Sequence, residues 1–396
     1  MANIFDYLIW RGDLSFSQSP FNPVDAIILS QFSYLPLDGI VPGPDEEGGI
    51  SLRLAQKLFS EKLAKNESDI KSHVMFKEDP ALFLALASSV RFGDCHLFGY
   101  VNNSDISRET QFSAFCLLLG DDSCFVVFRG TDFSLVGWKE DFNMSFSEVI
   151  PAQVEAAEYL EKMASLTKGS IRLGGHSKGG NLAIYAASNC NKKNQKRIIE
   201  IYSNDSPGFH ETVIEGEGFG AIKDRIKAFI PESSIIGLLL EQRWDYSVIK
   251  SSKVGLMQHE LYSWEIAYNN MVFADKVSQK SLFVDKTIKQ WVGSFTKKER
   301  EKFTNALFTI LRASKAKSFT ELEKNWLPAA GSMIKTLGDA DNETKALLRK
   351  ILGVLFNTAI QNMNAFGLAP KVPKKNLLEK QESMEIEIEA KYEDYF

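Results

Sequence analysis

The sequence is poor in the residues that mark a metal-bound or disulfide-stabilised protein. It has only four cysteines and five histidines among 396 residues. The cysteines follow neither a disulfide nor a metal-binding spacing, and the histidines show no ligand spacing. We therefore expect reduced thiols buried in the core, a cytoplasmic location, and no metal or other cofactor. The cysteines are Cys95, Cys116, Cys124 and Cys190.

Long hydrophobic runs and basic tracts are absent as well. No uninterrupted apolar stretch approaches the roughly 18 residues that a membrane-spanning helix needs. The opening residues, MANIFDYLIWRGDLSF, lack a basic region followed by a long apolar one, so we expect no secretory signal peptide. A net charge of −5, with no basic tract, gives no reason to expect a nucleic-acid partner. The 44% apolar content is that of an ordinary globular protein.

Strand-like and helix-like segments alternate over the first two thirds of the chain. This alternation is typical of an α/β fold with a mostly parallel central sheet and helices on both faces. We predict that residues 1–274 form this α/β domain. Asn22, Pro23 and Asp25 have the order expected at a helix start. The predicted strands are residues 96–101, 111–119, 123–129, 171–173, 197–203 and 226–231.

The texture changes near residue 275. Residues 275–369 show three or four amphipathic helices and no strand pattern, and Thr296 with Glu299 forms a capping box. We predict a smaller all-helical region there, which could be a lid, a dimer surface or a membrane-surface element. Amphipathic helices usually pack on their own domain, so we favour packing over membrane contact. Residues 370–396 are rich in Lys and Glu and are predicted to be a mobile tail.

A strand-turn-helix segment carries the clearest chemical signal. Residues 171–187 read IRLGGHSKGGNLAIYAA, and Gly175 to Gly179 fit the pattern G-x-S-x-G. In this nucleophile elbow, a sharp turn presents the serine, and small flanking residues allow the chain to pass close to itself. Its position between a strand pattern and a helix pattern makes Ser177 a candidate nucleophile.

A serine nucleophile needs a base, and that base needs an acid to orient it. Two histidines follow Ser177, and we favour His259, beyond the last predicted strand, over His210, which comes soon after the strand that follows the elbow. Asp205 is the first candidate for the acid because it directly follows a strand, at the sheet edge where functional groups gather. Glu232 is the second candidate and Asp245 the third. Each of these acids could equally be a turn residue that caps its own backbone.

An oxyanion hole requires backbone N–H groups that point to the place where negative charge develops. One donor should be the N–H of Lys178, which follows the nucleophile. The other should come from the loop that closes an earlier strand, and Thr131 in FRGTD fits that place.

Several separated motifs resemble known families. FRGTD, Trp138, Asp141, GGHSKGGNLA and a late His259 with Trp264 resemble the class 3, fungal-type lipases among the α/β-hydrolases. WRGDLSF, GHSKGGNLA, NDSPGF and QHELYSW resemble the bacterial Mbeg1-like family more closely, over about residues 1–270.

The resemblance implies an α/β-hydrolase fold with Ser177 as nucleophile, His259 as base, and Thr131 and Lys178 as oxyanion donors. It also implies that Arg129 and Asp141 are structural, as an ion pair that steadies the loop. Fungal-type lipases carry the acid after the strand that here is residues 226–230, where only Glu232 stands, whereas other lipases place it one strand earlier, where Asp205 stands. The acid therefore stays open between these residues.

These features predict a serine hydrolase that cleaves lipid-like or small acyl esters through an acyl-enzyme. The alternatives are a non-catalytic hydrolase fold that serves binding, and an acyltransferase or thioesterase at the same site. Lys178 stands where lipases usually carry an apolar residue. Its side chain could be solvated on the helix, or could be a cation at the pocket mouth that favours an anionic substrate. The oligomeric state and the ester's head group do not follow from the sequence.

Overall fold

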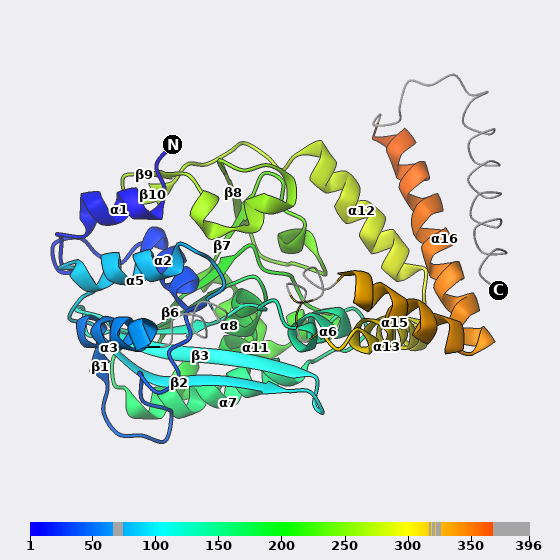
Figure 1. Cartoon of the computed structure of the whole chain (residues 1–396). Coiled ribbons are helices and arrows are strands. Elements are labelled where there is room, and N and C mark those ends of the chain that lie inside the picture. The colour runs from blue at the N-terminus through cyan, green and yellow to red at the C-terminus, as the bar shows by residue number, and fades with distance from the viewer. Residues whose placement is uncertain (66–73, 317, 319–320, 322–325, 367–396) are drawn as a thin grey trace.

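An eight-stranded sheet lies at the centre of the computed structural model, which describes residues 1–65, 74–316, 318, 321 and 326–366 (Figure 1). The strands lie in sequence order; β1 to β4 pair antiparallel, and β4 to β8 pair parallel. The predicted α/β-hydrolase fold with a mostly parallel sheet is therefore confirmed. The strands are β1 (Ile50–Ser51), β2 (His96–Asp105), β3 (Thr110–Leu118), β4 (Cys124–Phe128), β5 (Ile171–His176), β6 (Ile198–Asn204), β7 (Ile226–Pro231) and β8 (Tyr246–Ile249).

Helices cover both faces of the sheet. Crossovers between adjacent parallel strands are right-handed, so a run of them in one direction places its helices on the same face. Here α7 (Pro151–Leu166), α8 (Lys178–Asn189) and α11 (Glu217–Ile222) share that face. The opposite face is covered by α2 (Pro23–Phe32) and α5 (Asp79–Ser88), together with α1 (Ile4–Arg11) and α3 (Leu52–Lys65).

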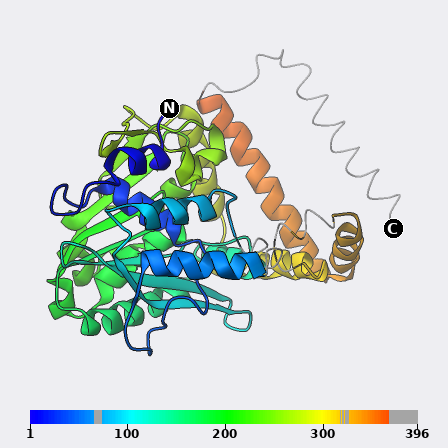
Figure 2. The same cartoon turned by 60° about the vertical axis from the view of Figure 1, so that its left-hand side comes forward.

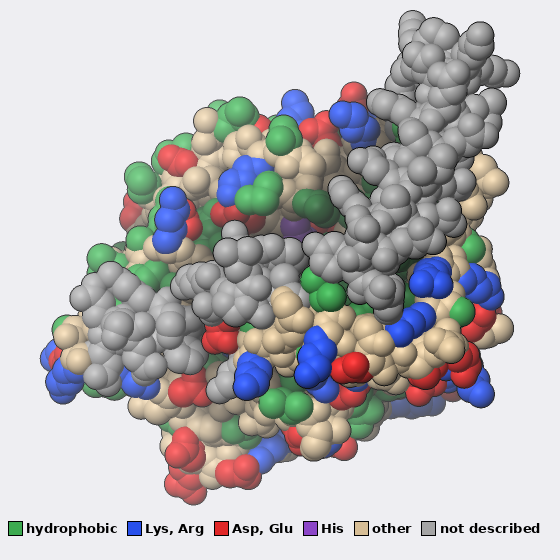
Figure 3. Space-filling model, turned by 45° about the vertical axis from the view of Figure 1, so that its right-hand side comes forward, with side chains coloured by type: hydrophobic (Ala, Val, Ile, Leu, Met, Phe, Trp, Pro, Cys, Tyr) green, Lys and Arg blue, Asp and Glu red, His purple; other side chains and the backbone are tan. Residues whose placement is uncertain are grey.

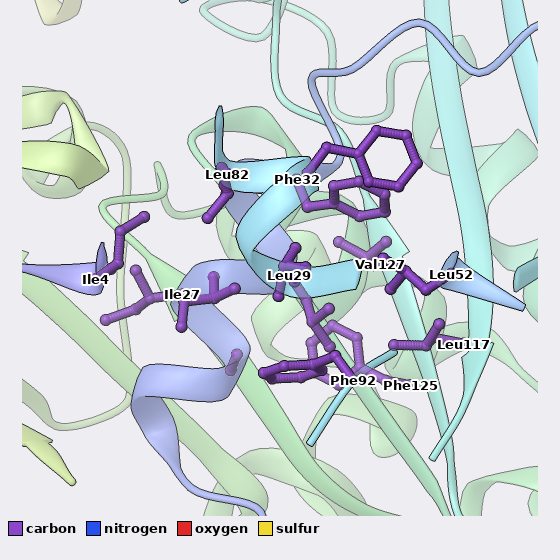
Figure 4. Packing of buried hydrophobic residues seen from close by; sticks show 14 of the residues in the cluster. Ile4, Ile27, Leu29, Phe32, Leu52, Leu82, Phe92, Leu117, Phe125 and Val127 are labelled. Carbon is purple, nitrogen blue, oxygen red and sulfur yellow. The ribbon is translucent and has the colours of Figure 1, made fainter. Parts of the chain in front are cut away.

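Strand β4 shows how the two cores meet. Its five residues are all buried, and they alternate between the two apolar clusters. Phe125 and Val127 point into the cluster beneath the amino-terminal helices, where Leu29 and Phe32 of α2 lie nearby (Figure 4). Val126 belongs to the cluster on the other face, under α7 and α8. The strand that leads to the predicted oxyanion loop is thus fixed from both sides.

The predicted capping residues begin their helices. The Asn22 side chain accepts the N–H of Val24, and the Asp25 carboxylate accepts the N–H of Asn22. Thr296 and Glu299 form the predicted capping box of α13 (Lys297–Ala313). The remaining short elements are α9 (Lys192–Gln195), α10 (Glu211–Ile214), η1 (Lys223–Arg225), η2 (Ile236–Leu238), η3 (Gly255–His259), η4 (Leu261–Ser263), β9 (Ile266–Ala267) and β10 (Asn270–Met271).

The carboxyl-terminal helices gather at one end of the molecule (Figures 1 and 2). They are α12 (Gln279–Gly293), α13, α15 (Trp326–Asp339) and α16 (Asn342–Ala365). Helix α13 packs against α6 (Leu135–Asn143), where the rings of Phe142 and Phe308 have centroids 5.5 Å apart. This contact joins the helical region to the α/β unit. The domain limits at residues 274 and 275 stay a prediction, and the predicted tail, residues 370–396, lies outside the described residues.

The helices were also compared with the length and apolar character of a membrane-spanning helix. Within the ranges that the structure describes, no helix has both the length and the apolar character needed to cross a bilayer.

Candidate functional site

Ser177 lies at the turn between β5 and α8, in the strained backbone that an elbow requires. Its φ of 56° and ψ of −133° are outside the regions that residues other than glycine usually occupy. Close packing explains the flanking glycines. A Cβ on Gly175 would lie 2.3 Å from the carbonyl carbon of Gly179, and a Cβ on Gly179 would lie 2.0 Å from the carbonyl oxygen of Phe128. The turn therefore holds a serine between two positions that only glycine can fill.

His259 and Asp205 meet beside this turn. Asp205 follows β6, and its Oδ2 lies 2.6 Å from Nδ1 of His259, which comes from η3 near the end of the sheet. The other carboxylate oxygen of Asp205 accepts the Ser234 hydroxyl at 2.5 Å and the N–H of Gly237 at 3.1 Å. Asp205 is 1% exposed. Its three hydrogen bonds hold the carboxylate in one orientation, with one oxygen directed at the imidazole.

The alternative candidates lie elsewhere. Glu232 makes no hydrogen bond to His259, and Asp245 is exposed; both belong to the part of the chain that is described. Nε2 of His210 lies 2.9 Å from the carbonyl oxygen of Met144, so its hydrogen bond is made to a different segment. Of the acids and bases considered, Asp205 and His259 are the two that the fold brings together.

His176, the residue before Ser177, holds the loop that carries His259. Its Nε2 lies 2.7 Å from the carbonyl oxygen of His259, and its Nδ1 lies 2.9 Å from the Tyr34 hydroxyl. A carbonyl accepts only, so Nε2 carries the proton and Nδ1 accepts from Tyr34. Burial and the neighbouring His259 hold the pKa of His176 well below its ordinary value. The neutral ring therefore ties the candidate base to the elbow.

The sequence reasoning missed this residue. The only signal was its position as the first variable residue of G-x-S-x-G, which leaves its identity open. The imidazole rings of His176 and His259 have centroids 4.3 Å apart, so the residue before the nucleophile and the candidate base are in direct contact.

The loop after β4 lies against the elbow. A Cβ on Gly130 would be 3.2 Å from the Cβ of Ser177 and 2.5 Å from the carbonyl oxygen of His176. Thr131 follows, and its hydroxyl donates to Oδ2 of Asp141 at 2.6 Å. Within the described chain, neither the N–H of Thr131 nor that of Lys178 has an acceptor. Two unpaired amides near the serine are what an oxyanion hole needs.

The Lys178 side chain contradicts both predictions made for it. It is 1% exposed, so it is neither solvated nor at a pocket mouth. Its ammonium donates to Oε2 of Glu140 at 2.7 Å and to the carbonyl oxygen of Gln111 at 3.0 Å. A buried ammonium requires such partners because desolvation of an unpaired charge is costly.

The predicted ion pair between Arg129 and Asp141 is also wrong. The Arg129 guanidinium donates to Asn102 at 2.9 Å and lies 3.7 Å from Asp132. Asp141 instead accepts the Thr131 hydroxyl and lies 3.9 Å from the Lys178 ammonium. Burial raises the pKa of Asp141 to about 6, although Lys178 and the Thr131 hydroxyl oppose the shift.

Ser177 and His259 are both partly exposed to solvent, but they are not hydrogen-bonded to each other. Ser177 is half-buried, the His259 side chain is 28% exposed, and the structure places no hydrogen bond between these two described residues. Such bonds are often long until substrate binds. The face drawn in Figure 3 has a hollow where histidine surface is visible beside hydrophobic and acidic side chains.

The described residues were also compared with the ligand sets that bind metal ions. No group of three or more His, Cys, Asp or Glu side chains there could hold a metal ion. The four cysteines are free and buried.

Among solved structures, the chain is similar to lipases. The M37 lipase structure shares 14% identity over 54% of this chain and 69% of its own, with a TM-score of 0.34. The Rhizomucor miehei lipase in its native propeptide complex shares 13% identity over 58% of this chain and 81% of its own, with a TM-score of 0.32. Because these identities and TM-scores are low, the fold is assigned from the strand order and not from these similarities. No curated protein matches the sequence.

The family model is more specific. The Mbeg1-like model matches residues 86–309, a span that includes the elbow, Asp205, His259 and the loop of Thr131. The match covers more than half of the sequence and confirms the family that its motifs resemble. The chain belongs to the Mbeg1-like family.

Proposed function

We propose that this protein is a serine hydrolase that cleaves carboxylic esters through an acyl-enzyme. The observation that carries the proposal is the 2.6 Å contact between His259 and buried Asp205, next to a serine in strained elbow geometry. A buried carboxylate at Nδ1 keeps the proton on that nitrogen, and this leaves Nε2 free to act as a base.

The reaction would proceed in two halves. The Ser177 oxygen attacks the ester carbonyl while Nε2 of His259 takes the hydroxyl proton. The resulting oxyanion is held by the N–H groups of Thr131 and Lys178. The carbon–oxygen bond to the alcohol then breaks, and the leaving alkoxide takes the proton from His259. Water repeats the sequence on the acyl-enzyme and releases the acid.

The surroundings of His259 suit these steps. The Asp205 carboxylate accepts three hydrogen bonds, which hold it in place beside Nδ1 of His259. His176 is held neutral by burial, so no second positive charge opposes the imidazolium that forms on His259. The Lys178 ammonium is paired with Glu140 at 2.7 Å.

Turnover of a series of p-nitrophenyl esters, from acetate to decanoate, tests the proposal and ranks acyl length. We expect wild-type hydrolysis that falls by several orders of magnitude in Ser177→Ala. Ser206→Ala is a matched control, because Ser206 is a buried serine near α8 that lies outside the proposed triad. A folded wild-type protein with the same background rate as Ser177→Ala on every ester would support the non-catalytic alternative instead.

A further inference from the structure

The lysine after the nucleophile is buried for a reason that ester hydrolysis alone does not explain. Lys178 lies in the first turn of α8, and its ammonium reaches Glu140 of α6 and the backbone of Gln111 in β3. Enclosing a cation beside the elbow carries a large desolvation cost, which only good partners offset. The side chain cannot touch a substrate, because it is 1% exposed.

Glu140 is the centre of this contact. It is fully buried, and both of its oxygens are occupied. One accepts Lys178 at 2.7 Å and the N–H of Gln111 at 3.1 Å, and the other accepts the N–H of Ala152 at 3.0 Å. A single carboxylate thus joins α6 to β3, to the start of α7 and to the nucleophile helix α8.

The next residue of α6 reaches the other oxyanion donor. Asp141 accepts the Thr131 hydroxyl at 2.6 Å and lies 3.9 Å from the Lys178 ammonium. The loop of Thr131 is therefore fastened to α6, and α6 is fastened to Lys178. The two residues proposed as oxyanion donors are thus connected through consecutive acids on one helix.

We propose that Lys178 and Glu140 are positioning residues whose buried ion pair fixes the Thr131 amide relative to the Lys178 amide. The oxyanion hole is then assembled before substrate binds. The inference rests on the proposed hydrolase function. Because oxyanion donors act on charge that exists only in the transition state, misplacing one lowers kcat and leaves KM nearly unchanged.

Lys139 provides a matched control on the same helix. It is also a buried lysine, it pairs with Glu109, and Glu109 also accepts from Asn143 at 3.0 Å. Neither residue of this described pair has a hydrogen bond or ion pair with Thr131 or α8. Lys139→Met therefore removes a buried cation from α6 without touching the connection between the two amides.

The experiment compares Lys178→Met, Glu140→Gln and Lys139→Met for kcat, KM, melting temperature and the rate of fluorophosphonate labelling. We expect kcat and the labelling rate to fall about 100-fold in the first two variants, the size of effect that a displacement of about 1 Å or a lost oxyanion donor produces. KM should change by less than about threefold. Lys139→Met should lower the melting temperature but keep kcat within about threefold of wild type.

The double variant Lys178→Met with Glu140→Met keeps the test decisive if a single variant does not fold. It leaves no unpaired buried charge, and apolar replacement of a buried pair is often neutral for stability. We expect it to be folded yet still impaired in kcat. Active wild-type protein with a fully active double variant, or with equal kcat losses in Lys178→Met and Lys139→Met, would overturn the inference alone. Folded wild-type protein that neither hydrolyses esters nor reacts with the probe would overturn the hydrolase proposal, and this inference with it.

Discussion

Replacing Asp205 by Asn tests the geometry of the proposed triad atom by atom. In the native protein, Oδ1 accepts two donors, from Ser234 and Gly237, and Oδ2 accepts Nδ1–H of His259. An asparagine has one acceptor oxygen and one donor NH₂ group. Its oxygen should face the two donors, because an NH₂ group there would meet two N–H or O–H groups. The NH₂ group then faces His259.

This orientation forces His259 into the wrong tautomer. Nδ1 must accept from the asparagine, so the proton moves to Nε2, which can no longer take the proton of Ser177. In a triad this change costs about 10⁴ in kcat, with the fold intact. At 1.36 kcal/mol for each factor of ten, the barrier rises by about 5 kcal/mol.

The assay is ester turnover at saturating substrate, with the melting temperature measured in parallel. Glu232→Gln and Asp245→Asn are the controls, since both remove a carboxylate that was a candidate on sequence grounds. We expect them to keep kcat within about threefold, because the His259 imidazole is hydrogen-bonded to Asp205 and to neither of these carboxylates. A folded Asp205→Asn protein that keeps a tenth or more of wild-type kcat would refute the assignment of Asp205.

Three further substitutions follow from other contacts. Gly179→Ala places a methyl group 2.0 Å from a carbonyl oxygen of β4, so denaturant unfolding should report a loss of about 3 kcal/mol or more; native stability would contradict the steric explanation of the elbow. His176→Phe keeps a ring but removes the hydrogen bond to the His259 carbonyl. It should lower the free energy of unfolding by about 1–3 kcal/mol and slow ester turnover. If stability and turnover both stay at the wild-type level, His176 does not hold the base. Asp141→Asn removes a carboxyl whose pKa is raised from 3.8 to about 6, so the folded form binds the proton more tightly and wild-type stability falls as pH rises from about 4 to 6. Urea unfolding at several pH values should therefore show the variant gaining on wild type across that window, and a constant difference would count against a buried carboxyl.

Local signals predicted most of the sheet. Residues 226–231 form β7 as expected, since an apolar run between turn residues has few other solutions in an α/β chain. Strand β8 was missed because it is only four residues long and follows an irregular segment. Helix α6 was missed as well. Its polar residues Lys139 and Glu140 are buried, so the apolar periodicity that marks a packed helix is weak.

In the candidate site, the sequence predicted the residues but not the contacts that link distant segments. Chain order and strand ends selected Ser177, Asp205 and His259, and the fold brings the last two into contact next to the first. Contacts between distant segments could not be read from spacing. The partner of Lys178 lies 38 residues earlier in the chain, and a lysine at the start of a helix is ordinarily solvated.

The role of His176 depends in the same way on distant segments. It requires Tyr34, 142 residues away, and the His259 carbonyl, 83 residues away. Lys178 and His176 are both polar side chains whose partners come together only when the sheet is assembled.

Intact-mass spectrometry after reaction with a fluorophosphonate probe addresses the nucleophile directly. If Ser177 is activated by His259 and Asp205, wild-type protein should gain one phosphonyl group, and peptide mapping should place it on Ser177. Ser177→Ala should stay unmodified, and His259→Ala should react far more slowly. A folded wild-type protein that remains unmodified, or that carries the label on another residue, would contradict the assignment of Ser177 as the nucleophile.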